Sequence, residues 1–413
     1  MREMKDSGIE WAGVIPNTWN INKGNYFMEL LTGPTLETDE VRTCFRDGEV
    51  TLRSKRREEG FTVSLTEAGY QGIEIGDLVV HGMDGFAGSI GISDSRGKAT
   101  PVLNVLDTEQ NKRYMMYLMR TMAYCELFLS LATGIRVRTC DTNWKKLREI
   151  DYILPTIPEQ KAIADFLDEQ CAEIDSLISD IQSQIEALEE YKRSVITEAV
   201  TKGLDPDVEM RDSGVQWIGM MPTHWDCQRG KYLLRYVQKP VRDDDGVITC
   251  FRDGEVTLRS NRREEGFTMA DKEIGYQGID VGDLVVHGMD GFAGSIGISD
   301  SKGKASPVLN VLDTEQNKRY IMYYLRSMAY NDVFVALATG IRVRSCDLRW
   351  NKLAELLYPM PPVEEQQAIV EHIDSVLERT NAIIADKKQQ IETIEEYKKS
   401  LIFEYVTGKK EVA

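Results

Sequence analysis

The chain has 413 residues, of which 42% are hydrophobic and 28% charged, and its formal net charge is −17. That length can bury ordinary cores and suggests about two to four domains. No charged segment followed by an apolar stretch opens the sequence, and no apolar run approaches the roughly 18 residues of a membrane helix, so we expect a soluble, cytoplasmic protein. The seven cysteines, an odd number without a Cys-x-x-Cys pair, argue against a disulfide framework and against a zinc ribbon.

The sequence contains one long internal duplication. Residues 11–201 recur without a gap 206 positions later, as residues 217–407. Within them, residues 43–54, 76–95 and 101–114 return unchanged as 249–260, 282–301 and 307–320. Such a period is too long for a solenoid repeat and fits a duplicated domain plus a connector. Two copies of one surface are expected to engage two copies of one target.

Each copy starts with a predicted mixed α/β domain. Residues 73–80 and 86–92 are rich in β-branched residues and are bounded by Gly and Asp, which predicts short antiparallel strands joined by tight turns. Residues 111–131 then change to a helical composition rich in Met, Leu, Tyr and Ala. We place the two domains at 1–157 and 205–361, and we predict the α+β fold class.

A long helix is predicted after each domain, at 158–204 and at 362–413. Apolar residues alternate spacings of three and four there, which is the pattern of a coiled coil. An amphipathic helix packed on its own domain is the alternative, but pairing the two helices buries both apolar stripes, and a pseudo-twofold relation between the copies would make them antiparallel. The predicted seam consists of Leu167, Ile174, Ile178, Ile181, Ile185, Leu188, Ile373, Leu377, Ile384, Ile391, Ile394 and Leu401.

The negative charge is concentrated in these connectors. Residues 158–203 carry eleven acidic and four basic side chains, and residues 362–413 carry eleven and seven. The domains can therefore still present the basic patches that phosphate contacts require. The acidic connectors suit a protein partner or simple solvation.

In this arrangement the chain resembles the specificity subunits of type I restriction-modification systems over essentially its whole length. The resemblance rests on the segments that open each domain, on the proline and Glu-Gln junctions that open each helix, and on the Glu-Glu-Tyr-Lys runs near the helix ends. These are Trp-Ala-Gly-Val-Ile-Pro at 11–16 and Trp-Ile-Gly-Met-Met-Pro at 217–222, Pro155-Thr-Ile-Pro-Glu-Gln160 and Pro359-Met-Pro-Pro-Val-Glu-Glu-Gln366, and residues 189–192 and 395–398.

The resemblance implies a non-catalytic subunit that recognises a bipartite site on double-stranded DNA. It implies two target-recognition domains, and spacer helices that dock two methyltransferase (modification) subunits, which would bind the S-adenosylmethionine; motor-nuclease (restriction) subunits can join. The chain itself is expected to need no cofactor and no metal. Because the domains are nearly identical in their central parts, we expect them to recognise an inverted repeat. Segments 29–41 and 235–247 differ between the copies and could make that repeat imperfect.

The candidate DNA-binding residues are basic, aromatic or amide side chains near Gly-rich turns. Arginine can bond guanine or phosphate with two donors, and an amide suits adenine. The basic clusters could instead be solvated turns paired with Glu58 and Glu59, and the Tyr-Gln pairs could simply be turns with a packed tyrosine. The candidates are Arg53, Lys55, Arg56, Arg57, Tyr70, Gln71, Arg136 and Arg138, with Arg259, Arg262, Arg263, Tyr276, Gln277, Arg342 and Arg344 in the second copy.

Two other classes of function stay open at this stage. His81 with Asp84, repeated as His287 with Asp290, could belong to duplicated active sites, although neither pair has an evident nucleophile or metal beside it. The acidic helices could also make the chain a coiled-coil protein scaffold. The basic clusters in both copies disfavour that scaffold.

Overall fold

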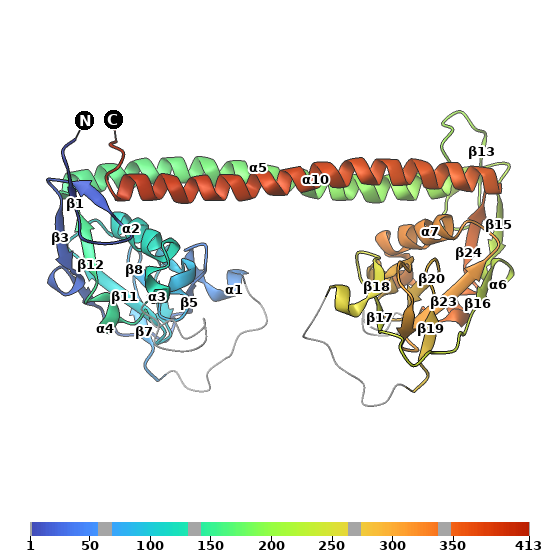
Figure 1. The fold of residues 1–413 in the computed structure, drawn as a ribbon, viewed down its shortest axis with the longest axis horizontal. Coiled ribbons are helices and arrows are strands. Elements are labelled where there is room, and N and C mark those ends of the chain that lie inside the picture. Colours follow the sequence, from blue (N-terminus) through green and yellow to red (C-terminus); the bar gives the residue numbers. More distant parts are fainter. Residues whose placement is uncertain (1, 57–67, 131–141, 263–273, 338–347, 413) are drawn as a thin grey trace. The chain divides into compact units, whose positions relative to one another are not determined.

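The computed structural model describes residues 2–56, 68–130, 142–262, 274–337 and 348–412 (Figure 1). Two compact units are present: unit 1 contains Met1–Ile181 with Lys388–Ala413, and unit 2 contains Gln182–Lys387. Each unit thus holds one predicted domain, the first half of the helix that follows it, and the second half of the other helix. The four predicted segments follow one another along the sequence, at 1–157, 158–204, 205–361 and 362–413. In the folded chain each long helix is instead divided between the two units.

In unit 1 the strands form two four-stranded sheets and two pairs. The sheet orders are β6-β5-β10-β7 and β4-β11-β8-β9, and the pairs are β1-β2 and β12-β3. The strands pair antiparallel, as predicted, except that β10 runs parallel to β5. They are β1 (Met4–Asp6), β2 (Val14–Pro16), β3 (Asn20–Lys23), β4 (Met28–Leu30), β5 (Val41–Cys44), β6 (Val50–Leu52), β7 (Gln71–Ile73), β8 (Leu78–His81), β9 (Ile90–Ile92), β10 (Gly97–Ala99), β11 (Leu103–Thr108) and β12 (Asp151–Leu154).

Unit 2 repeats these strands with small differences at the sheet edges. The sheet β16-β23-β20-β21 corresponds to β4-β11-β8-β9, and the remaining strands form the pairs β13-β14, β15-β24, β17-β18 and β19-β22. They are β13 (Met210–Asp212), β14 (Met220–Pro222), β15 (Asp226–Arg229), β16 (Leu234–Tyr236), β17 (Ile248–Cys250), β18 (Val256–Leu258), β19 (Gln277–Ile279), β20 (Leu284–His287), β21 (Ile296–Ile298), β22 (Gly303–Ala305), β23 (Leu309–Thr314) and β24 (Leu357–Met360).

Two helices of the domains are long enough to cover a sheet, α2 (Lys112–Tyr124) and α7 (Lys318–Tyr330). The predicted helical segment 111–131 is interrupted, because Glu126 has a left-handed φ of 57° before α3 (Leu127–Ser130). The shorter helices are α1 (Arg53–Arg56), α4 (Trp144–Leu147), α6 (Gly230–Leu233), α8 (Val333–Ala336) and α9 (Trp350–Leu353), with 3-10 turns η1 (Gly24–Tyr26), η2 (Gly85–Ala87), η4 (Arg259–Asn261) and η5 (Gly291–Ala293).

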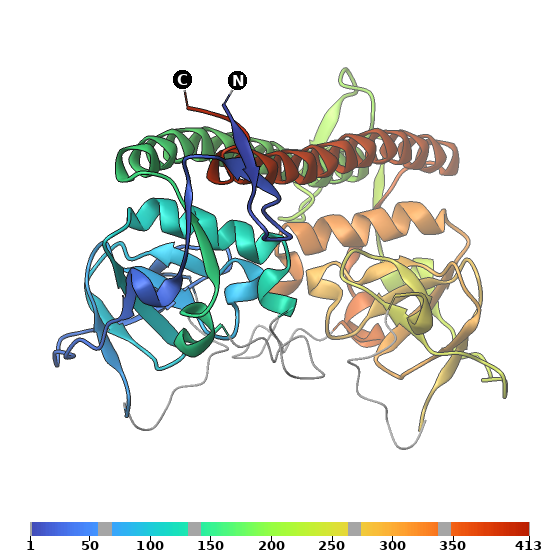
Figure 2. The ribbon, with the colours of Figure 1, turned by 60° about the vertical axis from the view of Figure 1, so that its left-hand side comes forward.

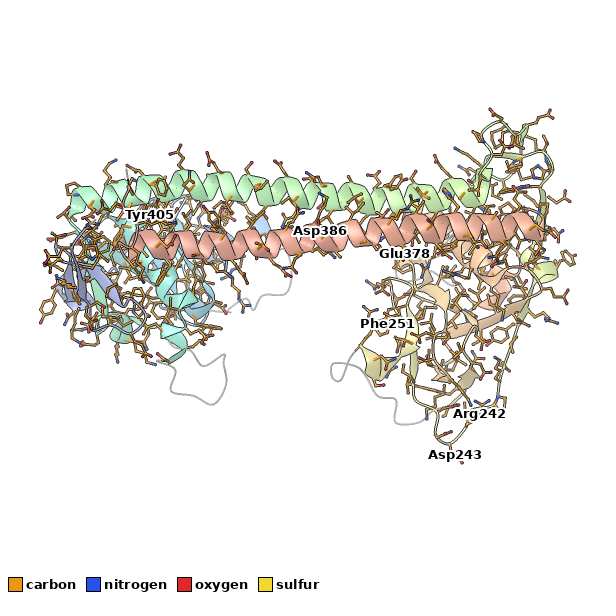
Figure 3. The ribbon with its side chains drawn as sticks, turned by 45° about the horizontal axis from the view of Figure 1, so that its top comes forward. Arg242, Asp243, Phe251, Glu378, Asp386 and Tyr405 are labelled. Carbon is orange, nitrogen blue, oxygen red and sulfur yellow. The ribbon has the colours of Figure 1, made fainter. Side chains whose placement is uncertain are left out.

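The two long helices are α5 (Ile157–Lys202) and α10 (Val363–Val406). Every predicted seam residue is buried or half-buried, whereas most positions between them are exposed. In unit 1 the rings of Phe166 and Tyr405 lie 4.4 Å apart, and Asp175 accepts a bond of 2.6 Å from Lys398 (Tyr405 is labelled in Figure 3). Residue numbers rise along α5 while those of its contacts fall along α10, so the predicted antiparallel pairing is confirmed. In unit 2, Lys387 donates to Gln184 over 2.5 Å.

The helices also pack on the domains, so the alternative interpretation of the heptads is partly right. In unit 1, Ile163, Leu167 and Cys171 share one core with α2 and with Leu401 from the second half of α10. In unit 2 the equivalent core includes Ile196 and residues of α7, the orange helix that lies below the red α10 in the ribbon of Figure 2. On each long helix, the same apolar stripe therefore packs on a domain near the end of the helix. Further along, the stripe packs on the other long helix.

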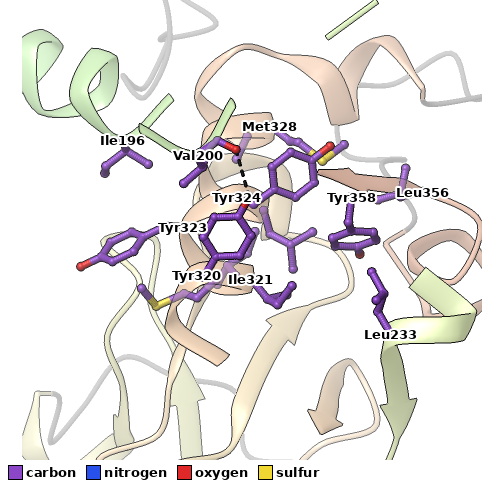
Figure 4. Close-up of a cluster of buried hydrophobic side chains, with 14 of the residues drawn as sticks. Ile196, Val200, Leu233, Tyr320, Ile321, Tyr323, Tyr324, Met328, Leu356 and Tyr358 are labelled. Carbon is purple, nitrogen blue, oxygen red and sulfur yellow. Dashed lines mark hydrogen bonds between the residues drawn. The ribbon is translucent and has the colours of Figure 1, made fainter. Parts of the chain in front are cut away.

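A buried tyrosine links each domain to the far end of a long helix. The hydroxyl of Tyr114 donates to the carbonyls of Ile153 and Val406, at 3.1 and 3.2 Å. The hydroxyl of Tyr320 donates to the carbonyls of Pro359 and Val200, at 2.9 and 3.1 Å (Figure 4). Each domain thus completes its core with the end of the helix that follows the other copy.

The Glu-Gln junctions attach the start of each long helix to its own domain. Gln160 and Gln366 are both 0% exposed. The amide of Gln160 bonds Gln110, the carbonyl of Pro155 and the backbone nitrogen of Asn111, which caps α2. The preceding Glu159 accepts from the indole of Trp19, and Glu365 accepts from that of Trp225 in the same way. No helix among the described residues is both long and apolar enough to cross a membrane.

Candidate nucleic-acid interface

The basic cluster of the first copy lies beside a hollow of about 780 Å³ in unit 1. The turn between β5 and β6, helix α1 and the turn after β8 form its walls. The hollow brings two predicted DNA-contact residues together with the His-Asp pair that was predicted as an alternative site. Its lining includes Arg46, Arg53, Arg56, His81 and Asp84.

Arg56 is held by its own neighbours. It donates to Asp47 over 2.5 Å and to Glu49 over 3.0 Å, and its guanidinium lies 4.5 Å from the centre of the Phe45 ring. The hydrogen bond that Arg56 donates to Asp47 raises the pKa of Arg56 above its usual value. The predicted alternative partners Glu58 and Glu59 lie outside the described residues, and the turn that precedes α1 supplies the carboxylates instead.

Arg262 repeats this arrangement in unit 2, with Asp253 at 2.7 Å, Glu255 at 3.0 Å and the Phe251 ring at 4.3 Å (Figure 3). In each copy one guanidinium nitrogen, Nη1, serves both carboxylates while the guanidinium lies over an aromatic ring, so the side chain is held against its own turn. Arg56 and Arg262 are therefore better suited to stabilising their turns than to contacting a base.

Of the other described basic candidates, Lys55 is exposed, whereas Arg53 and Arg259 are half-buried. Lys55 is 57% exposed and lies 3.6 Å from Asp94. Arg53 lines the hollow, and its counterpart Arg259 donates from Nε to Thr249 over 3.2 Å. The candidates Arg57, Arg136, Arg138, Arg263, Arg342 and Arg344 lie outside the described residues.

The two glutamine candidates connect strands. Gln71 on β7 donates its amide to the carbonyl of Leu103 over 2.9 Å, and Gln277 on β19 donates to that of Leu309 over 2.7 Å. Gln277 is only 4% exposed. Amides in these positions cannot present both groups to an adenine, so the geometry favours the structural alternative. Tyr70 and Tyr276 are half-buried beside them.

His81 and Asp84 form a braced turn. The Nδ1 atom of His81 accepts from the backbone nitrogens of Met83 and Asp84, at 3.3 and 3.0 Å. Burial lowers the pKa of His81, as it does for His287. A neutral imidazole whose Nδ1 already caps a turn is poorly placed for proton transfer, and the described residues contain no group of three His, Cys, Asp or Glu that could hold a metal. The geometry does not support the enzyme alternative.

One charged residue of this hollow was missed by the sequence analysis. Arg46 is 67% exposed and donates to Asp84 over 3.0 Å, and Arg252 is 66% exposed and donates to Asp290 over 3.2 Å. The signal was available, because Arg46 lies in the block 43–54 that returns unchanged. The DNA-contact candidates were chosen where basic residues are densest, which is at residues 53–57.

Comparisons with known proteins support one family. No family model matches the chain. It is 24% identical over 322 residues to a Methanocaldococcus jannaschii protein assigned as the type I restriction enzyme MjaX specificity subunit, covering 74% of this chain and 71% of that protein. It is 27% identical over 326 residues to the type I restriction enzyme MjaVIII specificity subunit of the same organism, covering 73% and 72%.

The fold is shared with a chain from a structure that describes complex assembly and conformational transition of the type I R-M system. The TM-score is 0.65 at 11% identity, over 95% of this chain and 98% of that one. The relatives and the fold therefore confirm the resemblance found in the sequence: this chain is related to the type I restriction enzyme specificity subunits.

Proposed function

We propose that this chain is the DNA-specificity subunit of a type I restriction-modification complex, and that it is not itself an enzyme. One observation carries the proposal: the domain has a basic hollow whose charged residues recur in the second copy. The two specificity-subunit relatives support the same function. Arg46, Arg53, Arg56, His81 and Asp84 return as Arg252, Arg259, Arg262, His287 and Asp290. Clustered arginines at open turns are suited to the phosphates and base edges of double-stranded DNA.

The target is an inverted repeat. Every charged residue that lines the hollow has an identical counterpart in the second copy, so both domains should recognise the same short sequence. Each unit also receives the end of the other copy's helix through Tyr114 or Tyr320, and such reciprocal exchange is expected of copies related by a two-fold axis. Two nearly identical domains related in that way would contact opposite strands of DNA.

The partners are two methyltransferase subunits that dock on the spacer helices and carry S-adenosylmethionine; motor-nuclease subunits complete the complex for restriction. The exposed faces of α5 and α10 are acidic, which suits a protein partner more than DNA. A scaffold function without DNA binding would leave the basic hollow without a role.

Sequencing that detects methylated bases in the host genome, with and without this gene, tests the proposal. We expect deletion to abolish adenine methylation at one bipartite inverted repeat, and reintroduction of the gene to restore it. Loss of an asymmetric motif would preserve the specificity function and refute the inverted repeat. An unchanged methylome would refute the proposed function.

A further inference from the structure

We propose that Arg46 and Arg252 each recognise one guanine in their half-site, and that Asp84 and Asp290 are the positioning residues that hold them. This inference rests on the proposed function and assigns the recognition to two ion pairs. It predicts a G·C pair at one symmetric position of each half-site.

The first step of the argument is that the turn carrying Arg46 is fixed. The backbone nitrogens of Phe45 and Gly48 donate to Glu49 and Phe45, both over 2.9 Å, and Gly48 has a left-handed φ of 84°. A β-carbon on Gly91 would lie 1.8 Å from the carbonyl oxygen of Gly48, so the turn packs tightly against β9. The second copy repeats this contact at 2.0 Å between Gly297 and Gly254.

The second step is that the turn carrying Asp84 is fixed against the first one. His81 accepts from the backbone nitrogens of Met83 and Asp84, as described above. Gly88, with a φ of 91°, packs so closely that a β-carbon would lie 3.0 Å from the carbonyl oxygen of Arg46. The corresponding distance for Gly294 and Arg252 is 2.7 Å. Two braced turns therefore hold the arginine and the aspartate in one relative position.

The third step concerns the donors that Arg46 has available. The Nη2 atom of Arg46 donates to one oxygen of Asp84, and within the described residues no second carboxylate bonds this guanidinium. Arg56, by contrast, is shared between two carboxylates and a ring. An arginine has five N–H donors, and the bond to Asp84 uses one of them. Two of the remaining donors can bond the O6 and N7 acceptors of guanine.

The fourth step is the advantage of holding an exposed arginine in advance. A long side chain loses rotamer freedom when it binds, and a carboxylate that already orients it reduces that loss. A lysine at the same position would keep the charge without the two-donor geometry. Arg46→Lys therefore separates base recognition from simple attraction to phosphate.

The test uses the full chain in complex with the modification subunit of the same host, on DNA fragments randomised within both half-sites. Arg46→Ala is expected to reduce the preference for guanine roughly tenfold to a hundredfold at one position of one half-site. The other half-site, recognised through Arg252, serves as the internal control. Arg46→Lys is expected to relax the same position while keeping overall affinity, and Asp84→Asn is expected to relax it partially.

A control pair has the same chemistry outside the hollow. Arg229 and Glu355 form an exposed ion pair in unit 2, and Glu355→Gln is expected to leave the preferred sequence unchanged. The melting temperature of each variant is measured alongside, and we expect Arg46→Ala to melt with the wild type because exposed pairs contribute little to stability.

Three results would overturn the inference. Equal weakening at all sequences, with a shallower salt dependence, would make Arg46 a phosphate contact. Tighter binding by Asp84→Asn with an unchanged motif would show that Asp84 competes with DNA instead of positioning the arginine. An unchanged profile for Arg46→Ala would remove the residue from recognition. If the wild-type complex selects no bipartite sequence at all, the proposed function itself fails.

Discussion

Replacing Gln366 by leucine should destabilise unit 2 strongly. The side chain is 0% exposed and makes three hydrogen bonds: its nitrogen donates to Gln316 over 2.8 Å and to the carbonyl of Pro361 over 2.9 Å, and its oxygen accepts from the backbone nitrogen of Asn317 over 3.0 Å. Leucine fills a similar volume but bonds none of these groups. The carbonyl of Pro361 would stay buried without this partner, and the half-buried Gln316 and Asn317 would lose theirs.

The size of the effect follows from those three bonds. At about 1 kcal/mol each, with an additional penalty for buried groups left unsatisfied, the loss is about 3–5 kcal/mol. For a unit of this size each kcal/mol lowers the melting temperature by about 2–4 °C, so we expect a decrease of roughly 6–20 °C. Differential scanning calorimetry of the full chain measures it.

The neighbouring residue provides a matched control. Gln367 is exposed, and it bonds Glu371 and the side chain of Asn317, each over 2.8 Å at the surface. Gln367→Leu is expected to change the free energy of unfolding by only about 0.5 kcal/mol. Gln160→Leu should reproduce the large loss in unit 1, because it makes the equivalent three bonds. Similar melting temperatures for the Gln366 and Gln367 variants would refute the argument.

Two further predictions concern titratable groups. Burial lowers the pKa of His81 and His287 below the ordinary value of 6.5, so as the pH falls the unfolded chain takes up their protons before the folded chain does. The free energy of unfolding should therefore keep the full contribution of these histidines above about pH 6.5 and decrease below it. Replacing both by asparagine should flatten this pH dependence in a series of urea denaturations, and an unchanged dependence would contradict the assignment. Burial also raises the pKa of the Cys44 and Cys250 thiols to about 12. Iodoacetamide at pH 8 should therefore label the exposed Cys125 before either of them, and mass spectrometry would measure the three labelling rates. Equal rates in the native protein would contradict the burial of Cys44 and Cys250.

The sequence predicted the large elements well because their signals are long and periodic. The seam residues of α5 and α10 repeat over many turns, and the duplication fixes the number of domains independently of any propensity. The short strands were predicted less exactly. Residues 74–77 form a turn inside the predicted strand 73–80, since Gly76 adopts a φ of 84° that the composition of the segment does not reveal.

The candidate site was harder to predict because a contact residue depends on its neighbours in space. Arg56 and Arg46 are ten positions apart and look equally suitable in the sequence. Only the structure shows that two carboxylates engage Arg56, whereas Asp84, which is distant in the sequence, reaches Arg46. Gln71 was chosen for its amide, and a carbonyl on a neighbouring strand engages that amide. Composition carries no information about such partners.

One hydrogen bond that lies within a single copy differs between the two copies. Trp217 donates its indole N–H to the hydroxyl of Tyr324 over 3.1 Å, but Leu118 occupies the corresponding position of the first copy, and within the described residues the indole nitrogen of Trp11 is buried without a partner. The loss of this hydrogen bond in the first copy lowers the stability of that copy alone.

One contact that joins the copies is retained in both. Tyr114 bonds the carbonyl of Val406 and Tyr320 that of Val200, so each tyrosine must fit a helix end belonging to the other copy. A change in either helix end alters the core of the opposite domain, which restricts what both can accept. The reciprocal exchange of helix ends therefore explains why these four residues match between the copies.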